Sequence, residues 1–235
     1  MDLIVEEKEI KKVRLDFSKA HITYKDSMEQ KVVGVTTALN LKAKQALIGW
    51  AYKRGKEGLE LYSSRDKAAD IGTIVHARIM GYFLGYEIDR YNISQEAWDL
   101  VEESMKSFYE WARPRNVRPI LVEVPMVSEI YRFGGTPDVY GEMDDKLTLL
   151  DFKTGSGIYD DQFLQVAAYS QLLTENGYSH SKIIILNIPK SKGDRFRVED
   201  CSTDELELEF KEFMKFAEAW DLERQIKAKK RGGVI

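Results

Sequence analysis

The spacing of hydrophobic residues changes character near residue 114 and predicts helices before that point and strands after it. Up to about Val35 the apolar positions alternate weakly, which indicates short strands or an extended arm. Beyond Val35, apolar residues recur every three or four positions in three stretches, as they do along one face of a helix. The predicted helices cover residues 41–62, 66–84 and 94–111, and the last of them begins with Ser94 as its N-cap.

Strands dominate the next part of the chain. Pro114 and Pro119 end the last of the three helices, because proline cannot donate a backbone hydrogen bond and clashes with the preceding turn. The alternation that follows predicts a three-stranded antiparallel meander over residues 120–127, 131–141 and 146–153.

The C-terminal part of the chain predicts a helix, two strands and a second helix. Residues 159–175 carry a helical pattern that ends at Asn176 and Gly177, a common C-terminal signal. Residues 182–188 read as an apolar strand, residues 194–199 as an edge strand and residues 203–229 as an amphipathic helix. This order of elements indicates an α/β core with a helical flank.

The composition limits the class of protein and the kind of site. Of the 235 residues, 43% are hydrophobic and 31% are charged, which is typical of a globular protein with its own core. The one cysteine, Cys201, excludes a disulfide framework, a thiolate zinc site and a protein-ligated iron–sulfur cluster, since each needs several cysteines. The formal charge of −4 excludes binding of DNA over the whole surface, but not binding in one local groove.

The expected location follows from the hydrophobic runs. No run approaches the roughly 18 apolar residues of a membrane span. The first residues also lack the apolar core of a signal peptide. We therefore expect a cytoplasmic protein without membrane contact.

Two acidic residues stand at matching positions of a predicted hairpin. If the loop between residues 131–141 and 146–153 is centred on Asp144 and Asp145, Asp138 lies directly opposite Asp151, with Cβ atoms about 5 Å apart. Lys153 is two residues beyond Asp151 and therefore shares its face of the strand. The intervening Phe152 then points to the other face, into the core.

Facing carboxylates suggest a cation between them. Two like charges opposite each other in a half-buried sheet destabilise it unless a cation is bound. Oxygen ligands without cysteine or a histidine cluster favour Mg²⁺ or Mn²⁺ over zinc. A divalent ion beside Lys153 is suited to hydrolysing a phosphodiester. The alternative is that Asp138 merely ends a strand and that Asp151 and Lys153 form a surface ion pair.

Three further features bear on this choice. Gly72 lies in a predicted helix, where glycine costs about 1 kcal/mol relative to alanine, so a close approach is expected there, and His76 shares its face. Gln165 and Tyr169 are one helical turn apart and can direct their polar ends to one point. Glu123 stands among apolar residues in the strand before the hairpin. Each has a plainer interpretation: a core histidine, an amphipathic helix face and an exposed strand position.

In this order, the motifs resemble those of the RecB-like branch of the PD-(D/E)XK nuclease superfamily. They are Gly72…His76, Glu123, Gly135…Asp138, Asp151-Phe152-Lys153-Thr154 and Gln165…Tyr169. The similarity spans about residues 35–169 and is greatest to compact stand-alone exonucleases of the phage and mitochondrial-genome-maintenance type. The iron–sulfur members of the family are excluded, because this chain lacks their cysteine ligands.

The resemblance implies an architecture. The expected fold is a restriction-endonuclease-like α/β core, with a central mixed sheet flanked by helices and an N-terminal helical part. Residues 1–115 would form an arm and the helical part that contributes His76. Residues 116–235 would form the nuclease core, the two making one compact domain.

The resemblance also implies metal ligands. Asp138 and Asp151 would bind one or two Mg²⁺ or Mn²⁺ ions, with the backbone carbonyl of Phe152 as a further ligand. Glu123 would be an auxiliary acid at the metal. His76 would contact a metal ion or the scissile phosphate.

The remaining matched positions would act on the substrate. Lys153 would be the catalytic lysine. Gln165, Tyr169 and Thr154 would bind DNA and hold the site in place.

The predicted activity is metal-dependent hydrolysis of DNA by an exonuclease that acts on single strands or duplex ends, in recombination, repair or phage replication. A structure-specific or flap endonuclease is a second interpretation. A third is a non-catalytic DNA-binding subunit, although binding alone does not need two facing carboxylates. The chain has no P-loop of the GxxxxGK[ST] form, so any unwinding must come from a partner. The expected partners besides DNA are a helicase, a recombinase or a single-strand-binding protein.

Overall fold

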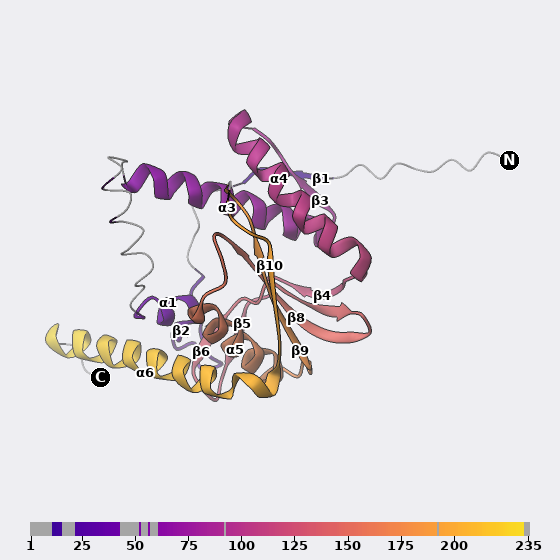
Figure 1. Cartoon of the computed structure of the whole chain (residues 1–235). Helices are drawn as coiled ribbons and strands as arrows, with labels where there is room; N and C mark the ends of the chain where they lie inside the picture. The colour runs from indigo at the N-terminus through magenta and orange to yellow at the C-terminus, as the bar shows by residue number, and fades with distance from the viewer. Residues whose placement is uncertain are drawn as a thin grey trace.

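A mixed five-stranded sheet forms the centre of the molecule (Figure 1). Its strand order is β10-β9-β8-β7-β4, with β8 and β9 parallel and the other neighbours antiparallel. The strands are β4 (Arg118–Val122), β7 (Val139–Met143), β8 (Lys146–Thr154), β9 (Lys182–Ile188) and β10 (Arg197–Ser202). The computed structural model describes residues 11–15, 22–42, 52, 56, 61–91, 93–191 and 193–232, and for residues 61–70 the backbone alone.

Helices cover both faces of this sheet (Figure 1). One face packs against α3 (Leu61–Leu84) and α4 (Gln95–Ala112), and the other against α5 (Asp160–Glu175). The long helix α6 (Glu207–Lys230) packs on α5, outside this layer. Side chains of β8 alternate between the two cores, so that Leu149 packs with α5 while Leu150 and Phe152 pack with α3 and α4. The predicted inward direction of Phe152 is thus confirmed.

Two smaller sheets and three short helical segments complete the described part of the chain. The strand order β2-β6-β5 joins β2 (Val33–Gly34), β6 (Phe133–Gly135) and β5 (Met126–Ser128). A parallel pair joins β1 (Lys11–Val13) and β3 (Tyr86–Ile88), which the sequence did not predict. The short segments are α1 (Val35–Leu39) and the 3₁₀ turns η1 (Arg113–Arg115) and η2 (Thr203–Leu206).

Most of the predicted helices are confirmed, with shifts at their ends. The helix expected at 66–84 begins earlier, at Leu61, and the helix expected at 94–111 is α4, whose N-cap Ser94 accepts a hydrogen bond from the Ala97 N–H. Those expected at 159–175 and 203–229 are α5 and η2 with α6. The helix expected at 41–62 falls largely outside the described residues.

The predicted meander is right in its order and wrong in its strand lengths. The stretch 120–127 divides into β4 and β5, because Glu123 adopts a left-handed φ of 49° and Pro125 has no N–H to donate. The stretch 131–141 divides into β6 and β7 at Thr136 and Pro137 for the same lack of a donor. The strand at 182–188 is correct, and the edge strand lies at Arg197–Ser202 rather than at 194–199.

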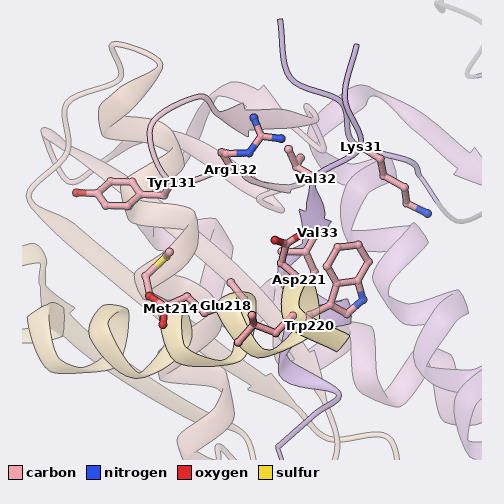
Figure 2. Close-up of a pocket in the computed structure, with 11 residues that line it drawn as sticks. Lys31, Val32, Val33, Tyr131, Arg132, Met214, Glu218, Trp220 and Asp221 are labelled. Carbon is pink, nitrogen blue, oxygen red and sulfur yellow. The ribbon is translucent and has the colours of Figure 1, made fainter. Parts of the chain in front are cut away.

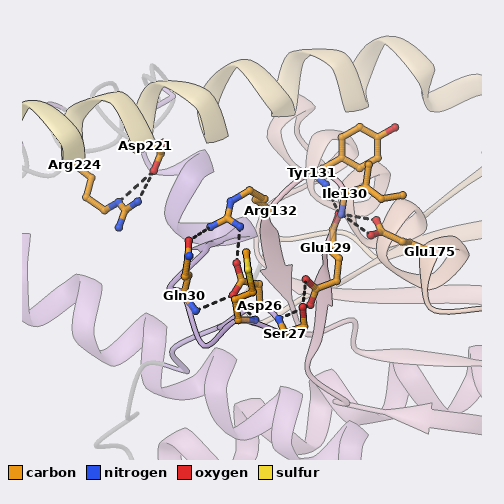
Figure 3. A network of polar contacts seen from close by, with 12 residues as sticks. Asp26, Ser27, Gln30, Glu129, Ile130, Tyr131, Arg132, Glu175, Asp221 and Arg224 are labelled. Atoms are coloured by element: carbon orange, nitrogen blue, oxygen red, sulfur yellow. Dashed lines mark hydrogen bonds and ion pairs between the residues drawn. The ribbon is translucent and has the colours of Figure 1, made fainter. Parts of the chain in front are cut away.

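A polar network ties the loop before β2 to the turn between β5 and β6 (Figure 3). The buried carboxylate of Asp26 accepts hydrogen bonds from the N–H groups of Met28 and Gln30 and from Arg132 Nη1, the last at 2.5 Å. Glu129 accepts from Ser27 in the same loop. These contacts fix the β2-β6-β5 sheet, and β6 leads directly into the segment that carries Asp138. No described helix combines the length and apolar character needed to cross a membrane.

Candidate active site

The register of the β7–β8 hairpin brings two carboxylates to the end of the central sheet. Val139 pairs with Leu150 and Met143 pairs with Lys146, so Asp144 and Asp145 form the two-residue loop. This is the predicted register. Its next step beyond Val139 places Asp138 opposite Asp151. Asp138 itself precedes β7, and its carbonyl accepts from the N–H of Glu123 at 2.9 Å.

The carboxylate of Asp138 is held by a backbone N–H and by a histidine. Its Oδ2 accepts a hydrogen bond from the Phe152 N–H at 2.7 Å, which ties it to β8. Its Oδ1 lies 3.2 Å from Nε2 of His76. Glu123 Oε1 lies 3.6 Å from the other ring nitrogen, Nδ1. Residues from three distant parts of the chain therefore meet at His76.

Asp151 is the buried member of the pair. Its side chain is 0% exposed, and Oδ2 forms an ion pair with Lys153 Nζ at 2.5 Å. Oδ1 has no hydrogen-bond partner among the described residues. A buried carboxylate oxygen without a partner is costly, and it points to a ligand that the protein part of the site does not supply.

The two carboxyl groups differ in their protonation. Burial raises the pKa of Asp151 to about 6, the nearby Asp138 charge adds to this effect, and Lys153 opposes it. Burial also acts to raise the pKa of Asp138, but His76, Lys153 and the Phe152 N–H outweigh burial and lower this pKa below 3.8. Asp138 is therefore the ionised partner at mildly acidic pH.

His76 is set up to be protonated. Burial acts to lower its pKa, but the charge and hydrogen bond of Asp138, together with Glu123, raise the pKa above 6.5. The close approach expected at Gly72 is confirmed, because a Cβ at this position would lie 2.6 Å from Thr154 Oγ1. Glycine thus lets α3 lie against the end of β8, and this contact brings His76 to Asp138.

Gln165 and Tyr169 of α5 approach the carboxylates from the other face. Gln165 Nε2 donates a hydrogen bond to the Tyr169 hydroxyl oxygen at 2.9 Å. Burial, and then the charges of Asp151 and Asp138, raise the pKa of Tyr169 well above 10, so it stays a neutral hydroxyl. Gly135 makes room for this ring, since a Cβ there would lie 2.7 Å from Tyr169 Cε1.

The structure therefore gathers eight of the nine predicted site positions at one place. The exception is Thr154, which ends β8 on the opposite face from Asp151 and contacts Gly72 of α3. The eight positions are His76, Glu123, Asp138, Asp151, Phe152, Lys153, Gln165 and Tyr169.

The donor set suits a hard divalent ion with few protein ligands. Within the described ranges, no three His, Cys, Asp or Glu side chains already converge as a ligand set. Instead Asp138 and Asp151 each contact a cationic side chain. Magnesium is commonly held by one or two carboxylates together with water, so two carboxylates and an unpartnered buried oxygen fit it. A zinc site with three or four nitrogen or sulfur ligands does not fit.

Sequence reasoning missed Tyr24. Its hydroxyl lies 2.8 Å from Thr136 Oγ1, two residues before Asp138. Its ring lies against the position that a Cβ on Gly134 would occupy. The paired glycines Gly134 and Gly135 were a signal that something packs closely on β6, but nothing in the sequence linked them to a residue so far away.

A cavity of about 360 Å³ lies elsewhere, between the β5–β6 turn and α6 (Figure 2). Val33, Arg132, Met214, Trp220 and Asp221 are among its lining residues. None of the predicted site residues lines it. The geometry of the carboxylates, rather than the size of a pocket, therefore locates the candidate site.

Comparison with known proteins supports the family suggested by the motifs. A profile of the PD-(D/E)XK nuclease superfamily matches residues 59–231. No curated protein matches the chain.

Several solved structures are similar at low identity. A protein named "Putative exonuclease" from Eubacterium rectale has 13% identity and a TM-score of 0.48, over 70% of this chain and 69% of that one. The alkaline exonuclease LHK-Exo from Laribacter hongkongensis has 16% identity and a TM-score of 0.30, over 66% of this chain and 84% of that one. These likenesses do not bear on the substrate.

Proposed function

The chain belongs to the PD-(D/E)XK nuclease superfamily, and we propose that it is a metal-dependent deoxyribonuclease of the RecB-like branch. We propose further that it is an exonuclease acting on single-stranded DNA or duplex ends in recombination, repair or phage replication. A helicase, recombinase or single-strand-binding protein would then be the kind of partner it works with.

One observation carries this proposal: the hairpin register sets Asp138 against Asp151, with Lys153 on the same face. Asp151 is fully buried, and its Oδ1 has no partner among the described residues. In a protein that only binds DNA, this arrangement would lower stability, and no bound metal ion would compensate for it.

Asp138 and Asp151 would hold one or two Mg²⁺ or Mn²⁺ ions, with the Phe152 carbonyl as a further ligand and with His76 and Glu123 beside them. The bound ion would supply a Lewis acid that neutralises phosphate charge and makes water a stronger acid. Ionisation of Asp151, whose pKa is raised to about 6 in the free protein, would then be favoured.

Lys153 is the group best placed to act on the phosphate. Its side chain is 18% exposed and pairs with Asp151. A lysine here would stabilise the negative charge that develops on the phosphate oxygens, or orient the attacking water. Protonated His76 would contact a non-bridging oxygen of the same phosphate.

Tyr169 would hold the substrate. Gln165 donates to its oxygen, which leaves the tyrosine hydroxyl hydrogen available for an acceptor such as a phosphate oxygen. Because its pKa lies well above 10, the hydroxyl keeps this hydrogen across the physiological pH range.

The test is cleavage of end-labelled DNA in Mg²⁺ or Mn²⁺ by purified Asp151→Asn and Lys153→Met. Each variant should keep the wild-type circular dichroism spectrum and lose activity by about 10²-fold or more, the typical loss for a group that stabilises developing charge. Asp204→Asn and Lys211→Met, at exposed positions of η2 and α6, are the matched controls. Undiminished cleavage by either site variant would remove these two residues from the mechanism.

Covalently closed single-stranded circles separate the two kinds of nuclease. An obligate exonuclease leaves closed circles intact and degrades the same DNA after linearisation. Cleavage of the closed circle would instead assign an endonuclease. Binding without turnover under every divalent metal would assign the non-catalytic DNA-binding subunit.

A further inference from the structure

A second lysine lies near the candidate active site, at the carboxyl ends of β8 and β9. Lys190 follows β9 by two residues. Its Nζ lies 3.6 Å from the point that a Cβ on Gly72 would occupy, and Thr154 Oγ1 lies 2.6 Å from the same point. The ammonium of Lys190 and the hydroxyl of Thr154 therefore flank one position on α3.

Neither polar group has a partner within the part of the chain that the structure describes. Lys190 Nζ makes no hydrogen bond and no ion pair there, and Thr154 Oγ1 makes no hydrogen bond. The charge of Asp194 acts to raise the pKa of Lys190. Its carboxylate accepts a hydrogen bond from the backbone N–H of Lys190, at 3.4 Å, and none from the ammonium.

An ammonium without a partner among the described residues is unfavourable at this place in the free protein. Lys190 is half-buried. Burial lowers its pKa, and the more distant Asp194 charge does not restore it. The Lys190 ammonium and the Thr154 hydroxyl can both donate hydrogen bonds to an anion. One anion bound between them would satisfy both groups.

The location relates this pair to the cleavage chemistry. Gly72 and His76 are one turn apart on α3, about 6 Å along the helix axis. His76 contacts Asp138, where the scissile phosphate would be bound. An anion held by Lys190 and Thr154 would thus lie roughly one nucleotide step away from the cleaved phosphate.

We propose that Lys190 and Thr154 form a binding site for a backbone phosphate of the nucleic-acid strand, next to the phosphate that is cleaved. This inference rests on the proposed function and deepens it. The site gives Gly72 a second role, because a larger residue would displace Thr154 Oγ1 from the anion position. It recognises charge rather than base identity, so it contributes affinity without sequence preference.

The first test measures the salt dependence of DNA binding. Lys190→Gln, Thr154→Val and the wild type are titrated with a fluorescent single-stranded oligonucleotide in EDTA, where a metal-dependent nuclease does not cleave. Lys190→Gln removes one cationic contact and should reduce the slope of log Kobs against log [salt] by about 0.7, which corresponds to about fivefold weaker binding at 0.1 M salt. Thr154→Val removes no charge, so it should weaken binding without changing the slope. Lys211→Gln, an exposed lysine of α6 that pairs with Glu207, is the control and should keep the wild-type slope.

The second test finds the phosphate. Single uncharged methylphosphonate linkages are placed one at a time around the cleaved bond. Wild-type binding should weaken about fivefold at one linkage next to that bond, as expected for one lost phosphate contact. Lys190→Gln should be insensitive at that linkage and behave like the wild type at the others.

A stability measurement excludes a merely structural role. Lys190→Met removes a half-buried ammonium that has no partner in the described part of the chain, so its melting temperature should equal or exceed that of the wild type while DNA binding weakens. A lower melting temperature with an unchanged salt slope would assign Lys190 to fold stability and overturn the inference.

The outcomes also separate this inference from the proposed function. Normal metal-dependent cleavage together with wild-type binding by Lys190→Gln would refute the phosphate site alone. If the wild-type protein neither binds nor cleaves nucleic acid, both are refuted.

Discussion

At the scale of single residues, two glycines on neighbouring strands make room for one tyrosine ring beside the acidic site. Gly34 and Gly134 pair across β2 and β6. The ring of Tyr24 lies over both of them, with Cγ only 2.3 Å from the point that a Cβ on Gly134 would occupy. Through the Tyr24–Thr136 hydrogen bond, this packing supports the segment that ends at Asp138.

We therefore expect Gly134→Ala to lower the free energy of unfolding by about 1–3 kcal/mol, the usual cost of overpacking. The new methyl group would displace the base of the Tyr24 ring, which cannot rotate away as a flexible side-chain end could. Gly157→Ala is the matched control, because nothing lies within 4 Å of its added Cβ. Urea denaturation compares the two, and equal stability of both variants would contradict this packing.

The pKa shifts of Asp151 and His76 predict how the metal-free protein depends on pH. Both groups have a raised pKa in the folded state, Asp151 about 6 instead of 3.8 and His76 above 6.5. Folding thus favours their protonated forms, and the stability they contribute is lost as the pH rises through the folded pKa values. Asp138 has a lowered pKa, so the stability that it contributes is present at higher pH and is lost only as the pH falls below 3.8.

The unfolding free energy in EDTA should therefore fall between pH 4 and pH 7. Asp151 accounts for roughly 2–3 kcal/mol of this change, at 1.36 kcal/mol for each pKa unit. In Asp151→Asn the curve should be flatter by that amount between pH 4 and 6. Parallel curves for the two proteins would show that Asp151 does not titrate as described.

At the scale of elements, the two-residue loop of the β7–β8 hairpin sets the register that aligns Asp138 with Asp151. Asp144 and Asp145 both adopt left-handed backbone conformations, with φ of 50° and 59°. This matches the turn type that continues the twist of a hairpin, but glycine adopts it at lower cost than aspartate.

Asp145→Gly should therefore stabilise the protein by about 1 kcal/mol without changing the register. The same substitution at Asp99, an exposed position within α4, should destabilise it, because glycine is a poor helix former. Thermal unfolding distinguishes the two cases. A lower melting temperature for Asp145→Gly would mean that the aspartate side chain stabilises the turn.

The register of the β7–β8 hairpin could be predicted from the sequence for a physical reason. The division of the neighbouring stretches, 120–127 and 131–141, into separate strands could not. Loop length and alternation fix the register of a hairpin, so Asp138 and Asp151 could be aligned from the sequence. Hydrophobic alternation runs on through Glu123 and Pro137, although the backbone turns there and β5 and β6 enter another sheet. The prolines interrupt the strands locally, but contacts of β6 with β2 and Tyr24, remote in sequence, place it in the second sheet.

At the scale of the whole molecule, the candidate site forms where helices of both layers reach the same end of the sheet. His76 arrives from α3 on one face and Tyr169 from α5 on the other, and β8 lies between them. Helical spacing placed Gly72 with His76, and Gln165 with Tyr169, on one face of each helix, and the resemblance to the nuclease family implied that both helices serve one site. It could not show Lys190, since a loop lysine without a motif has no periodic signal and becomes notable only beside Gly72 and Thr154.

The negative net charge of the chain is compatible with this arrangement. A charge of −4 leaves binding of a polyanion to local cations, and Lys153, Lys190 and His76 are grouped at one end of the strands of the sheet. A divalent ion would add to this local positive charge. The ion would therefore strengthen DNA binding beyond that of the metal-free protein, whereas cleavage would require it.

Anomalous density of Mn²⁺ in crystals of the protein shows whether Asp138 and Asp151 together bind the catalytic metal. Density from one or two ions, coordinated by the carboxylates of both Asp138 and Asp151 and absent from Asp151→Asn crystals, is the predicted result. Crystals saturated with Mn²⁺ that show no ion at these carboxylates, or show it only at other acidic residues, would contradict the account.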